Sequence, residues 1–292
     1  MTMMKLTSPR TIDEILEKYG LHFNKRYGQN FLIDENVVKK IVEAGEVGAS
    51  DWVLEIGPGI GTMTQELAQR ASRVAAVEID KKLVPVLHET LEDWDNVAVI
   101  QGDILKLNMA QELPDFYGHP FKVVSNLPYY VTTPIIMGFL ESELPVERMT
   151  FLVQKEVGER ICAAPGGKSY GALSIAAQFY AEPHVDFYVP STVFMPRPNV
   201  DSVVISLTRR EVPEDDPEKK AFFFRVVHGA FANRRKTLVN SLSMNLGCGR
   251  DVVTAALEQM GMDVRIRAES LTGENFAELA GLLEQAEAFK KE

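Results

Sequence analysis

The chain has 292 residues, 46% of them hydrophobic and 25% charged, which is typical of globular proteins with one large domain and a smaller one. Residues 1–20 lack the apolar core of a signal peptide, and no run reaches the roughly 18 apolar residues of a membrane span, so we expect a cytoplasmic protein. Cys162 and Cys248 lie far apart without CxxC spacing, which argues against a zinc site or disulfide framework and predicts two buried thiols.

Charge is unevenly distributed along the chain. The formal net charge is −10, yet residues 1–40 carry seven Lys or Arg against five Asp or Glu, and residues 221–250 carry five Lys or Arg and no acid. Net charge describes solubility, whereas clustered cations can meet phosphates. The two basic segments are therefore either solvated faces or contacts that flank an active site.

Short runs rich in Val and Ile alternate with helix-length segments from residue 52 onward. This alternation predicts βαβ units and a parallel sheet with strands buried on both faces. Only a proline-rich connection separates the last two runs, which favours an antiparallel pair at the sheet edge. The predicted strands are 52–57, 73–80, 96–103, 121–126, 148–154, 184–190 and 201–209.

The pattern changes after the last predicted strand. Residues 211–220 are acidic and contain two prolines, and everything beyond them has a helical pattern. Such a segment is typical of a domain boundary. We therefore predict an α/β domain over residues 1–212 and a small helical domain over 213–292.

A glycine-rich turn follows the first predicted strand of the sheet. Gly57, Gly59 and Gly61 precede a helical segment, and the next strand carries Glu78 about twenty residues further on. Such a turn lets the backbone approach a ligand closely, and an acid at the second strand end can bind ribose hydroxyls. The spacing predicts a nucleoside cofactor, with a ligand-free structural turn as the alternative.

The glycine pattern also bears on which cofactor binds. A dinucleotide fingerprint has a glycine where this chain has Thr62, and its pyrophosphate needs a free helix N-terminus. The GxGxG form with Glu55 ahead of it instead resembles motif I of S-adenosylmethionine-dependent methyltransferases. That cofactor carries no phosphate, and its sulfonium cation favours nearby carboxylates. An NAD-dependent oxidoreductase is the disfavoured alternative.

Two further polar residues stand at strand ends. Asp103 closes the third strand and Asn126 the fourth. The carboxyl ends of parallel strands face one ligand crevice, so we expect both side chains near Gly57 and Glu78. For Asp103 alone, a helix N-cap is an equally good interpretation.

The segment "NLPY", residues 126–129, suits an exocyclic amine of adenine, which is a poor nucleophile because its lone pair is delocalised into the ring. The side-chain oxygen of Asn126 and a backbone carbonyl near Leu127 or Pro128 can accept its two N–H groups. Tyr129 offers a face for stacking an extruded base. We expect most of the catalysis from positioning, with no His or Lys as general base. For Tyr130, core packing is the expected role.

Several motifs together resemble one family. "NLPY" resembles motif IV of N6-adenine and related amino-methyltransferases. With "KRYGQNFL" at 25–32, "VFMPRPNVDSVV" at 193–204 and "NRRKTL" at 233–238, the chain resembles the ribosomal RNA adenine dimethyltransferases over nearly its whole length. The match is best for the small-subunit (16S) group, and the large-subunit enzymes share "NLPY" and "QNFL".

The resemblance implies that residues 1–40 form a segment that caps the cofactor and contacts RNA. Within it, Gln29, Asn30 and Leu32 would close over the methionine part of the cofactor, with Gly57 beneath.

The resemblance also implies roles outside that segment. Glu78 would bind the ribose hydroxyls, and Asp103 the adenine amine of the cofactor. Phe194 would stack on the target adenine opposite Tyr129, whereas core packing is the expectation for Phe194 without the family match.

Basic residues in two places are candidates for RNA contact. Lys25 and Arg26 lie among aromatic residues near the N-terminus, and Arg234, Arg235 and Lys236 are predicted at a helix start. A surface that faces phosphates should bind RNA with steep salt dependence.

The sequence thus predicts an α/β class I, Rossmann-like methyltransferase, with a seven-stranded mixed sheet flanked by helices and an all-helical C-terminal domain. The expected reaction uses S-adenosylmethionine and no metal, and dimethylates N6 of two adjacent adenosines near the 3′ end of small-subunit ribosomal RNA, within a pre-assembled subunit. We expect a monomer. The alternatives are a large-subunit RNA dimethyltransferase and a non-catalytic ribosome-assembly factor that binds RNA.

Overall fold

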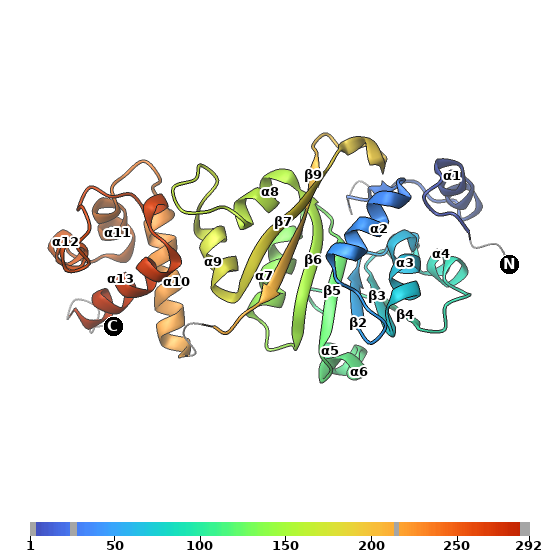
Figure 1. Cartoon of the computed structure of the whole chain (residues 1–292), viewed down its shortest axis with the longest axis horizontal. Helices are drawn as coiled ribbons and strands as arrows, with labels where there is room; N and C mark the ends of the chain where they lie inside the picture. The colour runs from blue at the N-terminus through green and yellow to red at the C-terminus, as the bar shows by residue number, and fades with distance from the viewer. Residues whose placement is uncertain (1–3, 24–27, 213–215, 287–292) are drawn as a thin grey trace. The chain divides into compact units, whose positions relative to one another are not determined.

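The computed structural model describes residues 4–23, 28–212 and 216–286 and contains a seven-stranded sheet (Figure 1). The strand order is β4-β3-β2-β5-β6-β9-β7. All seven strands predicted from the sequence are present, so that prediction is confirmed. Their bounds are β2 Trp52–Ile56, β3 Arg73–Glu78, β4 Val97–Gln101, β5 Phe121–Asn126, β6 Val146–Gln154, β7 Ala181–Val189 and β9 Ser202–Arg209.

The sheet is mixed, as predicted. β2 to β6 pair in parallel, and β9 runs antiparallel to β6. From β2 the chain builds outward through β3 to β4 and then returns to place β5 on the other side of β2. This reversal is a topological switch point, where ligands of open α/β sheets bind beyond the carboxyl ends of the strands.

Helices pack on the sheet through apolar faces. In α2, Asp34 caps the N-terminus by accepting from the amides of Asn36 and Val37, and Val38 and Ile41 are buried in one core cluster with residues of α3, β2, β5 and β9. These helices position the glycine turn that lies between β2 and α3. The helices around the sheet are α1 Pro9–Lys18, α2 Glu35–Ala44, α3 Thr62–Arg70, α4 Val84–Thr90, α5 Met109–Glu112, α6 Pro114–Tyr117, α7 Thr132–Glu141 and α8 Lys155–Ile161.

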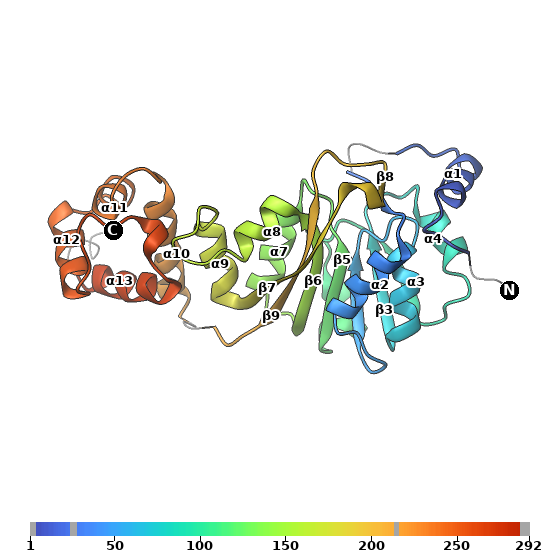
Figure 2. The same cartoon turned by 45° about the horizontal axis from the view of Figure 1, so that its top comes forward.

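A second, two-stranded sheet joins two segments that lie far apart in the sequence. β1 Phe31–Leu32 pairs antiparallel with β8 Phe194–Met195, which Figure 2 labels, and Leu32 stands opposite Phe194. The amide of Ile33 extends the pairing by donating to the carbonyl of Val193 at 2.9 Å. This sheet was not predicted, and it brings the "QNFL" segment against the "VFMP" segment.

Contacts divide the chain into two compact units. One contains residues 1–158 and 183–209, and the other contains 159–182 and 210–292. The second unit thus takes up a segment from the middle of the chain, whereas the boundary predicted at 212/213 would assign that segment to the first domain. That boundary stays a prediction. The remaining helices are α9 Ala172–Tyr180, α10 Pro217–Phe231, α11 Leu238–Leu246, α12 Arg250–Gln259 and α13 Gly273–Gln285.

The two cysteines differ in exposure. Cys248 is buried as predicted, but Cys162 is partly exposed, so the prediction for Cys162 is wrong. Cys162 directly follows the end of α8. No helix in the described part of the chain is long and apolar enough to cross a membrane. Within the same residues, no group of three or more His, Cys, Asp or Glu side chains could hold a metal ion.

Candidate active site

The glycine turn after β2 forms the floor of a pocket at the switch point. Gly57 and Gly59 have φ values of 68° and 63°, a region that favours glycine. A Cβ on Gly59 would stand 2.9 Å from a ring carbon of Phe31, so the N-terminal segment lies directly over the turn. The amide of Gly57 donates to the carbonyl of Val77 at 2.9 Å, which ties the turn to the end of β3.

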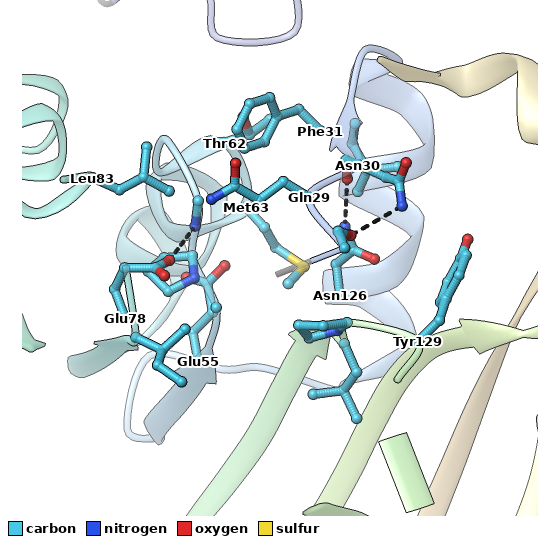
Figure 3. A pocket seen from close by; sticks show the side chains of 18 residues that line it. Gln29, Asn30, Phe31, Glu55, Thr62, Met63, Glu78, Leu83, Asn126 and Tyr129 are labelled. Carbon is cyan, nitrogen blue, oxygen red and sulfur yellow. Dashed lines mark hydrogen bonds between the residues drawn. The ribbon is translucent and has the colours of Figure 1, made fainter. Parts of the chain in front are cut away.

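Glu78, the last residue of β3, is joined to this turn (Figure 3). Its carboxylate accepts from the amide of Gly59 at 3.1 Å and from the amide of Asp80 at 2.8 Å. The side chain is buried, and burial raises its pKa to about 7 despite these two hydrogen bonds. Each carboxylate oxygen can accept a second hydrogen bond, which suits ribose hydroxyls.

Glu55 gives the pocket a second buried carboxyl. It is 1% exposed on β2, and burial raises its pKa to about 8. In the described structure its Oε2 and the buried Thr62 Oγ1 have no hydrogen-bond partner, although both residues line the pocket. A buried carboxyl oxygen without a partner is unfavourable, and a cationic ligand with N–H donors would compensate it. The residues present therefore fit S-adenosylmethionine, which carries a sulfonium and an ammonium group.

The N-terminal segment closes one side of the pocket. The side-chain nitrogen of Gln29 donates a hydrogen bond to Asp80 Oδ2 at 3.1 Å. The side-chain nitrogen of Asn30 donates one to the carbonyl of Gly28 at 3.1 Å. Both residues and the buried Leu32 line the pocket. The structure thus brings the three N-terminal residues predicted for the cofactor to the glycine turn.

The "NLPY" segment forms the opposite wall. Asn126 lies at the end of β5, and its side-chain nitrogen donates a hydrogen bond to the backbone carbonyl of Asn30 at 3.1 Å (Figure 3). The Pro128 carbonyl already accepts from the Val131 amide at 3.2 Å and from Thr132 Oγ1 at 3.1 Å. A carbonyl has two lone pairs, so the Pro128 carbonyl is fully used. Of the two carbonyls named from the sequence, that of Leu127 remains the better acceptor.

Asp103 lies in an adjoining pocket rather than in the one that contains Asn126. The two pockets share Gly57, Ile79 and Pro128. Asp103 accepts from the amide of Leu105 at 3.1 Å and lies 3.6 Å from the ammonium of Lys106. Tyr130 lines this second pocket and is 54% exposed, so the prediction of core packing for Tyr130 is wrong.

Phe194 does not face either pocket. Its side chain is 3% exposed and belongs to a core cluster that includes Leu32 and Val38. The cause is the pairing of β1 with β8, which turns the Phe194 ring into the core. This geometry differs from the predicted stacking on a base.

The basic residues of the C-terminal unit lie on a connection between helices. Arg234, Arg235 and Lys236 are exposed but precede α11, which begins at Leu238, so their placement at a helix start was wrong. Arg234 donates to the carbonyls of Lys168 and Tyr170 at 2.8 and 3.1 Å and thus holds the loop that carries them. Residues 25 and 26 lie outside the described residues.

Sequence reasoning missed two contributors to the pocket. Asp80 was only the last residue of the predicted strand 73–80, with no role of its own, yet it anchors Gln29. Phe31 was not assigned a role, yet it covers Gly59. The position of Asp80, two residues after Glu78, could have indicated a second acid at the pocket, whereas no local pattern pointed to Phe31.

A mixed seven-stranded sheet with this strand order, and a pocket for a cationic nucleoside at its switch point, defines the class I methyltransferases. The methyl donor is S-adenosylmethionine. The family model described as "Ribosomal RNA adenine dimethylase" matches residues 20–285, and the chain belongs to this family. It is therefore an enzyme that methylates adenine in ribosomal RNA.

Individual relatives agree with this assignment. The "Ribosomal RNA small subunit methyltransferase A" of Lachnoclostridium phytofermentans is 46% identical over 97% of this chain and 99% of its own. The protein of the same name from Alkaliphilus metalliredigens is 47% identical over 95% of this chain and 97% of its own.

Solved structures share the fold. The 23S rRNA methyltransferase ErmE is similar with a TM-score of 0.70 and 28% identity, over 88% of this chain and 100% of its own. A dimethyladenosine transferase from Plasmodium falciparum has a TM-score of 0.69 and 23% identity, over 85% of this chain and 95% of its own.

Proposed function

We propose that this protein methylates N6 of two adjacent adenosines near the 3′ end of small-subunit (16S) ribosomal RNA, giving N6,N6-dimethyladenosine in ribosome biogenesis. The relatives named for the small subunit are 46% and 47% identical over nearly the whole chain, against 28% for the 23S rRNA methyltransferase. This difference supports small-subunit RNA over large-subunit RNA as the substrate.

The orientation of the Asn126 amide carries the proposal. The nitrogen donates one N–H to the Asn30 carbonyl, which fixes the amide with Oδ1 on the other side, and Oδ1 can only accept. An adenine amine offers two N–H donors. Asn126 Oδ1 accepts one of them, and the Leu127 carbonyl accepts the other because the Pro128 carbonyl already has two donors.

These acceptors favour a more tetrahedral amine with its lone pair free to react. S-adenosylmethionine supplies the electrophilic methyl group when bound. Each neutral hydrogen bond contributes about 1 kcal/mol net. Holding the amine in line with the methyl group can remove several kcal/mol of the barrier. The ring of Tyr129, which lines the pocket, adds a stacking face worth about 1 to 3 kcal/mol per base.

The cofactor is held from three sides in this proposal. Glu78 accepts from the ribose hydroxyls, since its oxygens retain acceptor capacity beside Gly59 and Asp80. Asp103 accepts from the adenine amine in the adjoining pocket. The methionine part lies against Gln29, Asn30, Leu32, Gly57, Gly59 and Asn126.

For RNA, we assign phosphate contacts to Arg235 and Lys236, which are exposed. Arg234 contributes mainly by holding the 168–170 loop, because its guanidinium donates to two carbonyls there. Lys25 and Arg26 stay candidates on the basis of the sequence.

The test incubates the protein with labelled S-adenosylmethionine and undermethylated small subunits, and identifies dimethyladenosine by nucleoside mass spectrometry. Asn126→Ala should lose about ten- to hundredfold in kcat, and the protein should still bind the cofactor through its other contacts. Asn108→Ala is the matched control, because Asn108 is exposed and its side chain makes no capping hydrogen bond. Equal transfer by wild type and Asn126→Ala would refute the mechanism.

The same assay separates the alternatives. A preference for large-subunit RNA would assign the activity there, and RNA binding without transfer would indicate an assembly factor. We further propose a cytoplasmic monomer that acts on a pre-assembled small subunit. Assembled subunits should then be methylated faster than naked 16S RNA, and light scattering should give the mass of one chain, 32.6 kDa.

A further inference from the structure

We propose that Ser202 is a positioning residue for methyl transfer, because its hydroxyl holds the far end of the Tyr129 side chain. Tyr129 OH and Ser202 Oγ lie 2.7 Å apart. Ser202 is 0% exposed and is the first residue of β9, where it stands opposite Gln154 of β6. This inference rests on the proposed role of Tyr129 in stacking the target base.

Tyr129 needs a hydrogen bond at its hydroxyl end because it lies beyond the end of β5. The backbone fixes only one end of the side chain, and two torsions set the direction of the ring. The bond to Ser202 fixes the other end and thereby the plane of the ring, which lines the same pocket as Asn126 (Figure 3). Burial raises the pKa of the Tyr129 phenol, which keeps the hydroxyl protonated and able to donate.

Ser202 is itself held by its neighbour. The carboxylate of Asp201 accepts from the amide of Ser191 at 2.9 Å, and the Asp201 carbonyl accepts from the amide of Lys155 at 3.1 Å. These bonds join the start of β9 to the segment that leads into β8 and to the start of α8. The hydroxyl of Tyr129 therefore docks on a fixed strand end.

The chemistry of the second methyl transfer makes the direction of the ring more important. In the first transfer, two acceptors and the stacked ring orient the amine. The monomethylated amine has one N–H left, so one acceptor no longer contributes and a larger share of the orientation comes from the ring. Loosening Tyr129 should therefore slow the second transfer more than the first.

The experiment compares Ser202→Ala, Tyr129→Phe and the double variant by quantifying mono- and dimethyladenosine. Tyr129→Phe removes the same hydrogen bond but keeps the ring, so it tests the inference even if Ser202→Ala folds poorly. We expect each single variant to lose about tenfold in kcat with unchanged KM for the cofactor, since small misplacements of a reacting group are costly. The ratio of mono- to dimethylated product should rise severalfold.

The double variant should be no worse than either single one, because all three lack the same bond. Ser206→Ala is the matched control. Ser206 lies on the same strand, is 1% exposed and bonds to Asp186 at 2.7 Å, away from the pocket. This variant should lose stability but keep the kcat and product ratio of wild type.

Two results would overturn the inference. Ser202→Ala could match Ser206→Ala in kcat and product ratio, or the losses in the double variant could multiply. The variants are compared on whichever ribosomal RNA the wild type methylates. A wild type that acts on large-subunit RNA would thus refute the proposed substrate and still test Ser202.

Discussion

Replacing Glu55 by Gln should make the cofactor-free protein more stable at alkaline pH. Glu55 is 1% exposed on β2, and its Oε2 has no partner among the described residues. Burial raises its pKa from an ordinary 4.5 to about 8, and the neighbouring Glu78 has a pKa raised to about 7. Both carboxyls are thus driven toward the protonated form in the folded protein.

The direction of the pH effect follows from proton binding. Between pH 4.5 and 8 the folded protein keeps a proton on Glu55 that the unfolded chain has lost, so the free energy of unfolding falls as pH rises. One pKa unit corresponds to about 1.4 kcal/mol. Glu55 alone should therefore lower the free energy of unfolding by about 2 kcal/mol between pH 6 and pH 8. Gln cannot ionise, and Glu55→Gln should lose this share of the pH dependence.

Urea unfolding of the cofactor-free protein at pH 6 and pH 8 measures the effect, with Trp fluorescence as the signal. Trp52 belongs to the same strand as Glu55 and reports on it. Glu147→Gln is the control, because Glu147 is exposed on β6. Identical pH dependence in wild type and Glu55→Gln would refute the reasoning. Saturating S-adenosylmethionine should also reduce the pH dependence of wild type, since a bound cation favours the ionised carboxylates.

Three further variants test other parts of the site. Gly59→Ala should weaken cofactor binding at least tenfold by calorimetry, because φ is 63° and the new Cβ would meet Phe31 at 2.9 Å. Unchanged affinity would mean that the N-terminal segment moves freely. Asp103→Ala should weaken cofactor binding, whereas binding as tight as in wild type would remove Asp103 from the adenine site. Neutralising Arg235 and Lys236 together should reduce the slope of log K against log salt for RNA by about 1.4 to 1.8. An unchanged slope would show that neither residue contacts a phosphate.

The sequence predicted the sheet well because each strand has a local signature. Runs of Val and Ile bounded by turns mark β2 to β6, and the carboxyl ends of parallel strands must meet. Gly57, Glu78 and Asn126 were therefore placed together correctly from strand order alone. Asp103 also follows the carboxyl end of a parallel strand, but it lies in the adjoining pocket because β4 is the edge strand beyond β3.

Other features depend on contacts between distant segments, which no local pattern reveals. β1 and β8 have two residues each, too few for a periodic signal, and their pairing buries Phe194. The exposure of Tyr130 follows from its position in a turn that leads into α7 rather than from its residue type. Residues 159–182 join the C-terminal unit through contacts that helical periodicity cannot specify.

The pairing of β1 with β8 also explains why separate motifs are needed for one reaction. The Asn30 carbonyl, one residue before β1, fixes the nitrogen of Asn126, so the acceptor direction of Asn126 depends on where β1 lies. β8 holds β1, and the segment that contains β8 is tied through Asp201 to the strand that carries Ser202. In the proposed mechanism, the amide that orients the amine and the hydroxyl that holds the Tyr129 ring are thus connected through β1, β8 and Asp201.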